Sequence, residues 1–363
     1  MEMETLVSQK IIENSLVKMG NTSKLKEALK KEKIKIAFLG GSITQGFNST
    51  EYEKCYAHRT YLWFKNKFNK SEVEYINAGI GATGSIIGVH RVYEQVIEKK
   101  PDIVFLDASV NDKNTENEKI AYESLVRKFL TLDNEPAIIE LFMTDNKGNN
   151  VQEQQVKIGE RYNIPMISFR DAIYPEILEG RLKWTDILTD EVHPNDYGHF
   201  IISTLITSFV EKALKENSIN EKLVLKEPIF GDDFIEGTIK NSTNIEVEES
   251  EGFLIDTYGF QNFKYGWKFN SLRKKTSLIV KTKGKNIFLL YQKSINEKAG
   301  KIKVTIDNKK EIIVDTFFKD GWGDYSETEI LVKSKESSIH EIKIELIDFN
   351  EESIVNILGF LVS

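Results

Sequence analysis

Residues 34–46 read IKIAFLGGSITQG, and in this stretch an apolar strand runs directly into a serine flanked by glycines. Gly41 allows the backbone to turn sharply where a Cβ would clash. Ser42 then stands at the end of a strand, where a parallel sheet usually binds its ligands. A plainer interpretation is an ordinary strand-to-helix loop in which Ser42 only caps the helix that follows. The stretch alone leaves both interpretations open.

Apolar runs alternate with helix-spaced segments outward from this stretch. Strands are predicted at residues 34–39, 73–76, 103–107, 137–142 and 166–169. Helices are predicted between and after them, at about residues 61–68, 85–99, 119–132, 152–162 and 200–215. This alternation predicts βαβ units, and therefore a flavodoxin-like three-layer α/β sandwich with a parallel five-stranded sheet. In the flavodoxin-like strand order 2-1-3-4-5, the loops that carry Ser42, Gly81 and Asn111 meet beside the first strand.

The two ends of the chain have different patterns. Residues from about 6 to 33 predict one or two amphipathic helices that pack on the sheet edge. From about residue 228 onward, strand patterns follow one another without helices between them, with turns expected at 283–285 and 307–310. These strands predict an antiparallel β-sandwich or jelly roll. We therefore expect an α/β domain at residues 1–220 and an all-β accessory domain at residues 221–363.

Composition excludes several classes of protein. A length of 363 residues favours two domains, and a net charge of -7 argues against a nucleic-acid partner. Cys55 is the only cysteine, which excludes an intrachain disulfide and a cysteine zinc site. The first residues are acidic, and no apolar window is long enough for a membrane span. We expect a cytoplasmic protein without membrane contact, and the sequence leaves oligomers open.

The segment DEVHPN, residues 190–195, lies between the last predicted strand and the last helix. An acid three residues before a histidine can place both side chains on one turn, where the carboxylate fixes the imidazole tautomer. In this interpretation Ser42 attacks a carbonyl carbon, and His193 takes the serine proton and returns it to the leaving alcohol. Asp190 orients His193 and stabilises its charged form.

The same interpretation needs donors for the oxyanion that develops during such an attack. We expect them to be the backbone N–H of Ser42, a backbone N–H of Gly81 or Ala82, and the side-chain amide of Asn111. The alternative for Asn111 is a turn residue whose side chain bonds its own backbone.

The acid and the histidine also have other interpretations. Asp190 and His193 could form a helix-capping pair. Together with Asp196 and His199 they could bind a metal, since oxygen and imidazole ligands at short spacing suit zinc or iron. Against a metal, this is the only ligand-rich segment, and a local cluster has little geometric room. We therefore expect no metal.

A second motif competes with the serine interpretation. Residues 79–84, GIGATG, spell G-x-G-x-x-G after a strand and before a helix, and Asp107 falls where a ribose-binding acid would stand. However, this fingerprint normally follows the first strand of its fold. A nicotinamide enzyme would also leave Ser42, Asn111 and the Asp190–His193 pair unexplained.

Four blocks in order resemble the SGNH, or GDSL-like, hydrolase superfamily. They are GGSITQG, NAGIGATG, SVND and DEVHPN, which together cover roughly residues 34–205. One position departs from the family pattern, because Ala82 stands where a glycine is expected five residues after the asparagine of its block. A backbone N–H donor survives that change. The resemblance implies ester hydrolysis without metal or cofactor.

The GGSIT variant joined to a C-terminal β-sandwich resembles bacterial two-domain carbohydrate esterases that remove acetyl groups from plant polysaccharide fragments, including mannan-type acetylesterases. This resemblance implies an acetylated polysaccharide such as mannan or xylan. Trp322 and Tyr325 lie in a glycine-rich loop and could form a sugar platform of a carbohydrate-binding-module-like domain. The alternative is that they only pack a domain interface. Acetylated oligosaccharide is thus the expected substrate. A lipid or thioester hydrolase of the same superfamily is the runner-up, and a non-catalytic carbohydrate-binding protein is the alternative of another class.

Overall fold

The computed structural model describes residues 7–216, 225–269, 276–347 and 352–363. The chain divides into two compact units, Met1–Ile235 and Glu236–Ser363. The expected boundary at residues 220 and 221 lies outside the described residues. Each unit has its own hydrophobic core.

The first unit is built on a six-stranded sheet with the order β1-β6-β5-β4-β2-β3. Five of its strands run parallel, namely β2 (Lys33–Gly40), β3 (Glu72–Gly79), β4 (Ile103–Asp107), β5 (Ala137–Phe142) and β6 (Met166–Ser168). In chain order these five have the predicted 2-1-3-4-5 arrangement, which is confirmed. The register pairs Leu39 with Ala78 of β3 and with Leu106 of β4, so the ends of these strands lie side by side.

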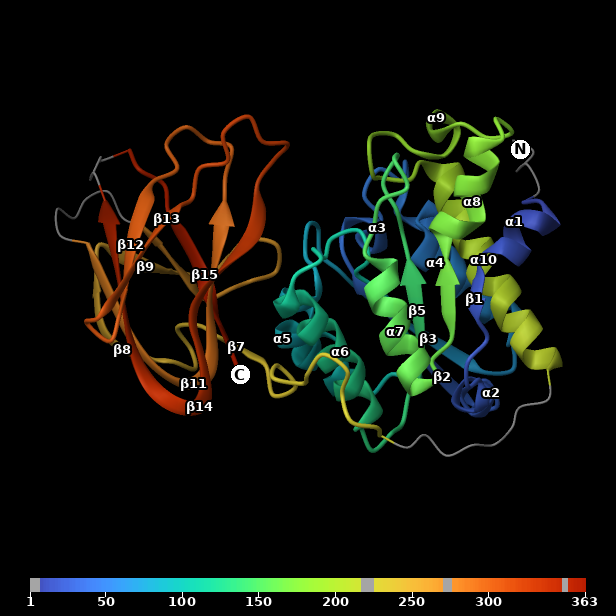
Figure 1. The fold of residues 1–363 in the computed structure, drawn as a ribbon, viewed down its shortest axis with the longest axis horizontal. Coiled ribbons are helices and arrows are strands. Elements are labelled where there is room, and N and C mark those ends of the chain that lie inside the picture. The colour runs from blue at the N-terminus through green and yellow to red at the C-terminus, as the bar shows by residue number, and fades with distance from the viewer. Residues whose placement is uncertain (1–6, 217–224, 270–275, 348–351) are drawn as a thin grey trace. The chain divides into compact units, whose positions relative to one another are not determined.

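Helices cover both faces of this sheet (Figure 1). They are α1 (Gln9–Asn14), α2 (Ser23–Ala28), α3 (Ser42–Gln45), α4 (Tyr56–Lys67), α5 (Ser85–Gln95), α6 (Glu116–Leu130), α7 (Gln152–Tyr162), α8 (Phe169–Leu178), α9 (Trp184–Ile187) and α10 (Asp196–Lys215), with the 3₁₀ turns η1 (Tyr52–Lys54) and η2 (Ile97–Lys99). Every residue of β4 is buried, as expected of a parallel strand that is covered on both sides. On one face, Phe38 stacks on Phe105 at a centroid distance of 4.7 Å within the core.

The N-terminal segment differs in part from its prediction. Residue 6 lies outside the described residues, and α1 and α2 form, but a short strand, β1 (Leu16–Lys18), lies between them. It pairs antiparallel with β6 at the sheet edge. A three-residue strand has too few positions to show a period of two, so helical spacing dominated the prediction there.

The second unit consists of β7 (Thr238–Lys240), β8 (Glu246–Glu251), β9 (Phe253–Asp256), β10 (Gly266–Phe269), β11 (Ser277–Lys293), β12 (Lys301–Ile306), β13 (Lys310–Asp315), β14 (Tyr325–Ile347) and β15 (Asn356–Val362). All ladders between these described strands are antiparallel, which confirms the all-β prediction. Its core includes Trp267, whose ring meets Phe360 edge-on at 6.2 Å. The jelly-roll topology stays a prediction.

Of the two turns expected in this unit, one is confirmed and one is wrong. Residues 307–310 join β12 to β13, with φ values of 53° at Asp307 and 54° at Asn308 that suit a tight hairpin. The turn expected at 283–285 is instead the middle of β11, which pairs with β14 on both sides of this point. The register shifts between Gly284 and Asn286, so the glycine marks a bulge and not a chain reversal.

The segment 225–235 belongs to the first unit because α6 holds it there. The buried carboxylate of Glu123 accepts the backbone N–H groups of Ile229, Phe230 and Gly231 at 2.7, 2.6 and 3.2 Å. Arg127 forms an ion pair with Asp232 at 3.1 Å. Buried charges of this kind need partners, so these contacts extend the first unit to Ile235.

Candidate active site

Three side chains from two loops form one line of hydrogen bonds at the carboxyl end of the parallel sheet. His193 Nε2 lies 2.8 Å from Ser42 Oγ, and His193 Nδ1 lies 2.7 Å from Asp190 Oδ2. Ser42 and His193 are half-buried, whereas Asp190 is exposed. An imidazole held between a hydroxyl and a carboxylate in this way can take the hydroxyl proton. The structure thus brings together the three residues that the sequence singled out.

The position of Ser42 follows from the glycines before it. Ser42 is the first residue of α3, directly after Gly41 and the end of β2. A Cβ at Gly40 would come within 2.2 Å of Thr44 Oγ1, so only glycine lets α3 fold back against the strand. The helix ends at Gly46 with φ 94°, and the N–H groups of Gly46 and Phe47 donate to the Ser42 carbonyl. Ser42 is therefore held on a tight, single-turn helix at the strand end.

Asp190 is held as an anion. Its Oδ1 accepts the backbone N–H groups of Val192 at 2.9 Å and His193 at 2.8 Å. Partial burial alone would raise the pKa of Asp190, but these backbone donors and the His193 side chain outweigh it and lower the pKa below its usual range. Asp190 thus keeps the charge that orients the imidazole.

The expected oxyanion donors differ in the partners and the backbone conformation that the structure gives them. The Asn111 side chain lies against Gly41, where an added Cβ would come within 2.3 Å of Asn111 Oδ1. The Gly81 N–H donates to Gln45 Oε1 at 2.9 Å, so a side chain of α3 already engages it. Ala82 has the left-handed φ of 58° that glycine would normally adopt.

Two residues that the sequence analysis did not assign support this loop arrangement. Asp112 accepts the Ser85 N–H at 2.6 Å and its hydroxyl at 2.5 Å, which fixes the loop of Asn111 to the start of α5. Burial raises the pKa of Asp112 to about 7. Asn77 Nδ2 donates to the Thr44 carbonyl at 2.9 Å and so joins β3 to α3. Both residues lie in the family sequence blocks quoted above, and this position was the signal that could have identified them.

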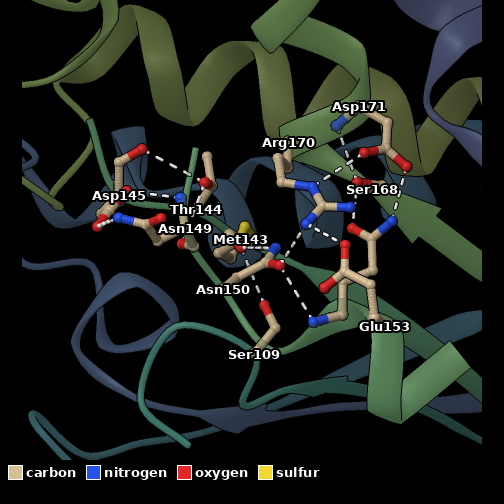
Figure 2. A network of polar contacts seen from close by, with 11 residues as sticks. Ser109, Met143, Thr144, Asp145, Asn149, Asn150, Glu153, Ser168, Arg170 and Asp171 are labelled. Atoms are coloured by element: carbon tan, nitrogen blue, oxygen red, sulfur yellow. Dashed lines mark hydrogen bonds and ion pairs between the residues drawn. The ribbon is translucent and has the colours of Figure 1, made fainter. Parts of the chain in front are cut away.

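A third support, the β5–α7 loop, carries no motif. In it, the Met143 carbonyl accepts Asn150 Nδ2 at 2.7 Å and the hydroxyl of Ser109, from the loop of Asn111, at 3.0 Å (Figure 2). Arg170 Nη1 of α8 donates to Asn150 Oδ1 at 2.9 Å. Backbone bonds extend the network, since the Asn146 N–H donates to the carbonyl of Glu191 at 2.7 Å. This loop therefore links the loop of Asn111 to the loop of His193.

The residues proposed for a metal have other partners. Asp196 accepts the Thr50 N–H at 2.8 Å and its hydroxyl at 2.7 Å. His199 is buried, its Nδ1 accepts the Tyr56 N–H at 3.3 Å, and burial lowers its pKa to about 4. Within the ranges that the structure describes, no group of three or more potential ligands could hold a metal ion.

The dinucleotide interpretation also meets an obstacle. Asp107 is buried, and its Oδ2 accepts the hydroxyl of Thr44 at 2.8 Å. A ribose-binding acid has to reach the ligand from the sheet edge. Asp107 instead binds Thr44 of α3. The G-x-G-x-x-G pattern here therefore shapes the loop that carries Gly81 and Ala82.

Trp322 and Tyr325 lie in the second unit. Their rings stack at a centroid distance of 5.1 Å, and Phe318 meets both rings edge-on. Trp322 is 70% exposed, while Tyr325 is half-buried. Asp324 anchors the loop by accepting the Ile295 N–H at 2.9 Å. The cluster therefore presents an aromatic surface on its own unit.

None of the helices in the described ranges is both long enough and apolar enough to cross a membrane. The model of the GDSL-like lipase/acylhydrolase family matches residues 38–201, the part of the chain that holds the site. No protein with a curated description matches this sequence significantly.

Two solved structures match almost the whole chain. A two-domain esterase (CEX) active on acetylated mannans is 32% identical, with a TM-score of 0.92 over 97% of this chain and 98% of that chain. The same kind of esterase co-crystallised with mannopentaose is 31% identical, with a TM-score of 0.91 over 97% of both chains. Together with the family match, these likenesses confirm the predicted resemblance: the chain belongs to the GDSL-like lipase/acylhydrolase family and is a carboxylic ester hydrolase.

Proposed function

We propose that this protein is a serine esterase that removes acetyl groups from O-acetylated carbohydrate. The observation that supports the proposal most is the hydrogen-bonded line from Ser42 through His193 to Asp190. Neither a capping pair nor a carbohydrate-binding protein needs an imidazole nitrogen at 2.8 Å from a serine hydroxyl. An esterase does.

The reaction follows from this line. His193 Nε2 takes the proton of Ser42 as Oγ attacks the acetyl carbon, and the resulting imidazolium is stabilised by Asp190. His193 then gives the proton to the sugar ester oxygen, which leaves as a hydroxyl when its bond to the acetyl carbon breaks and acetyl-Ser42 forms. Water attacks this ester with His193 again as the base. Acetate leaves, and Ser42 recovers its proton.

The oxyanion of each tetrahedral intermediate needs fixed donors. The N–H of Ser42 at the start of α3 and the amide of Asn111 are two of them. For the backbone donor of the glycine block we assign Ala82, because the Gly81 N–H is engaged by Gln45 Oε1. With its left-handed φ of 58°, Ala82 keeps the backbone conformation that a glycine at this position would supply.

Two observations support a carbohydrate substrate. The matching esterase is active on acetylated mannans, and its second structure was co-crystallised with mannopentaose. In the second unit, the exposed ring of Trp322 stacked on Tyr325 offers the flat apolar surface on which a pyranose ring can lie. We infer that this aromatic cluster binds the oligosaccharide, as a carbohydrate-binding module would.

Acetate release tests the substrate class. Wild type and Ser42→Ala would be incubated with acetylated mannan, acetylated xylan and a long-chain 4-nitrophenyl ester. We expect the wild type, but not Ser42→Ala, to release acetate from at least one of the two polysaccharides. We also expect the wild type to cleave little of the long-chain ester. Rapid cleavage of that ester without acetate release would instead support the lipid or thioester hydrolase.

The role of the aromatic cluster has its own test. Trp322→Ala should raise KM for acetylated oligosaccharides while leaving the hydrolysis of 4-nitrophenyl acetate unchanged, because the small ester does not need a sugar platform. An unchanged KM for oligosaccharides would show that Trp322 has no role in binding. The cytoplasmic location stays a prediction of the sequence, which leaves the oligomeric state open.

A further inference from the structure

We propose that Asn48 is a positioning residue for the triad and holds the Asp190 carboxylate in the orientation that His193 requires. The proposal rests on the serine esterase function above and adds a residue to it. Asn48 belongs to none of the family blocks and lies just after the helix that carries Ser42.

The contact is direct. Asn48 Nδ2 donates to Asp190 Oδ2 at 3.0 Å and to Thr189 Oγ1 at 2.6 Å. Asp190 Oδ2 is the same oxygen that meets His193 Nδ1. In the part of the chain that the structure describes, the other hydrogen bonds to Asp190 come from its own loop, at Val192 and His193. Asn48 therefore links the segment after α3, the helix that carries Ser42, to Asp190.

The backbone places the amide there. Asn48 has a left-handed φ of 65°, a conformation that asparagine adopts more readily than most residues. Its neighbour Phe47 contributes as well, since its ring lies 4.6 Å from the His193 imidazole between centroids. Two consecutive residues after α3 therefore contact the acid and the base of the triad.

Because the Asp190 side chain is exposed, a further hydrogen bond is needed to hold its orientation. The Asp190 side chain is 44% exposed, so water competes for both of its oxygens. The backbone N–H groups of Val192 and His193 bind Oδ1. The carboxylate can still rotate about this oxygen unless a donor also binds Oδ2. Asn48 Nδ2, a second donor to Oδ2 beside His193 Nδ1, restrains that rotation. A misplacement of about 1 Å in such a group can lower turnover by about 100-fold.

The charged groups around this contact come from three elements. Asp196 and His199 belong to α10, and Lys54 of η1 pairs with Asp196 at 3.0 Å. The exposed Glu191 is next to Asp190 in the chain. Thr50 also binds Asp196 through its backbone and its hydroxyl. The segment after α3 therefore stays joined to the start of α10 when the Asn48 amide is removed.

Two variants separate the contact from the backbone. Asn48→Gly keeps the left-handed conformation but removes the donor. Asn48→Asp keeps the shape but places a carboxylate beside Asp190. We expect kcat for 4-nitrophenyl acetate to fall about 10-fold to 100-fold in both variants, with KM within about two-fold of wild type. Thr50→Val is the matched control and should keep the wild-type kcat, because it removes the hydroxyl contacts to Asp196 and Lys54 but keeps the backbone bond to Asp196.

The pH profile reports whether residue 48 lies beside the Asp190–His193 pair, whereas the fall in kcat at nearly unchanged KM in Asn48→Gly reports on positioning. In Asn48→Asp the added negative charge favours the protonated imidazole, whereas catalysis needs the neutral base. The acidic limb of kcat/KM should therefore move to higher pH by about half a unit, and it should stay near its wild-type position in Asn48→Gly.

The outcome distinguishes this proposal from the function on which it rests. If Ser42→Ala is inactive while both Asn48 variants are folded and match the wild type in kcat and pH profile, the Asn48 proposal is wrong and the esterase stands. If Ser42→Ala keeps its activity, the esterase mechanism itself fails. Circular dichroism and thermal unfolding of each variant show that the comparison is made between folded proteins.

Discussion

Gly41 and Asn111 lie so close that the two positions are coupled: a Cβ added to Gly41 would stand 2.3 Å from Asn111 Oδ1 and 3.0 Å from its Cγ. The glycine before the nucleophile therefore makes room for the side chain that we assign to the oxyanion hole. Since the amide oxygen faces Gly41, the amide nitrogen is left to donate to the substrate.

Asn111→Ala should lower kcat about 10²-fold to 10³-fold, because one oxyanion donor is lost. Gly41→Ala should give a similar loss, since the new methyl group displaces the Asn111 amide. In the double variant the two losses should not multiply. Fully multiplicative losses in 4-nitrophenyl acetate hydrolysis would mean that Gly41 acts on something other than Asn111.

Ala82→Gly should keep activity and should not destabilise the protein. The N–H donor remains, and glycine relieves a left-handed conformation that costs other residues about 1–2 kcal/mol, which offsets the greater freedom of the unfolded chain. The matched control is Ala121→Gly in the interior of α6, where a loss of at least about 1 kcal/mol is expected. Urea unfolding measures both. Equal destabilisation by the two substitutions would contradict the expectation for Ala82.

Asp107→Asn should change how stability depends on pH. Burial raises the pKa of Asp107 from 3.8 to about 7, so between these values the folded protein keeps a proton that the unfolded chain loses. The wild-type free energy of unfolding therefore loses about 1.4 kcal/mol per pH unit from this group as pH rises.

The variant lacks this pH-dependent loss. Its free energy of unfolding should therefore rise relative to that of the wild type as the pH increases from about 4 to 7. Asp112, His90 and His199 also titrate abnormally, but they are present in both proteins and cancel in the difference. Urea unfolding at several pH values gives the difference directly. Parallel pH dependences in the two proteins would show that Asp107 is not the buried acid described here.

A chain that ends after Ile235 should be more stable than one that ends after Lys215. The shorter chain removes three backbone donors from Glu123, whose carboxylate then keeps the Tyr162 hydroxyl as its remaining donor among the described residues. An unsatisfied buried group costs at least about 1–3 kcal/mol, and a charged one more. Glu123→Gln should restore part of the loss in the shorter chain, because a neutral amide is cheaper to bury than a carboxylate. Equal thermal unfolding of both truncated chains would contradict the role of Glu123.

The sequence predicted the strand order and the meeting of Ser42 with the Asp190–His193 pair because both depend on local patterns joined by a topological rule. Alternating strands and helices indicate a parallel sheet, and parallel strands place the loops after them at one edge. Side chains at strand ends are then neighbours, whatever their separation in the chain.

The residues that the sequence did not assign owe their positions to contacts without a period. Asn48 meets Asp190 from 142 positions away, and Gln45 meets Gly81 from 36 positions away. No propensity or spacing encodes either hydrogen bond, which depends on where two irregular loops cross. The bulge near Gly284 was misjudged for a related reason, since a glycine between lysines indicates a turn until β14 is seen to pair on both sides of it.

Hydrolysis of 4-nitrophenyl acetate by wild type and by Ser42→Ala tests the central claim most directly. If Oγ of Ser42 is the nucleophile, its removal should lower kcat at least about 10⁴-fold while circular dichroism and the melting temperature stay those of the wild type. A folded Ser42→Ala protein that keeps kcat within about ten-fold of the wild type would contradict the serine mechanism.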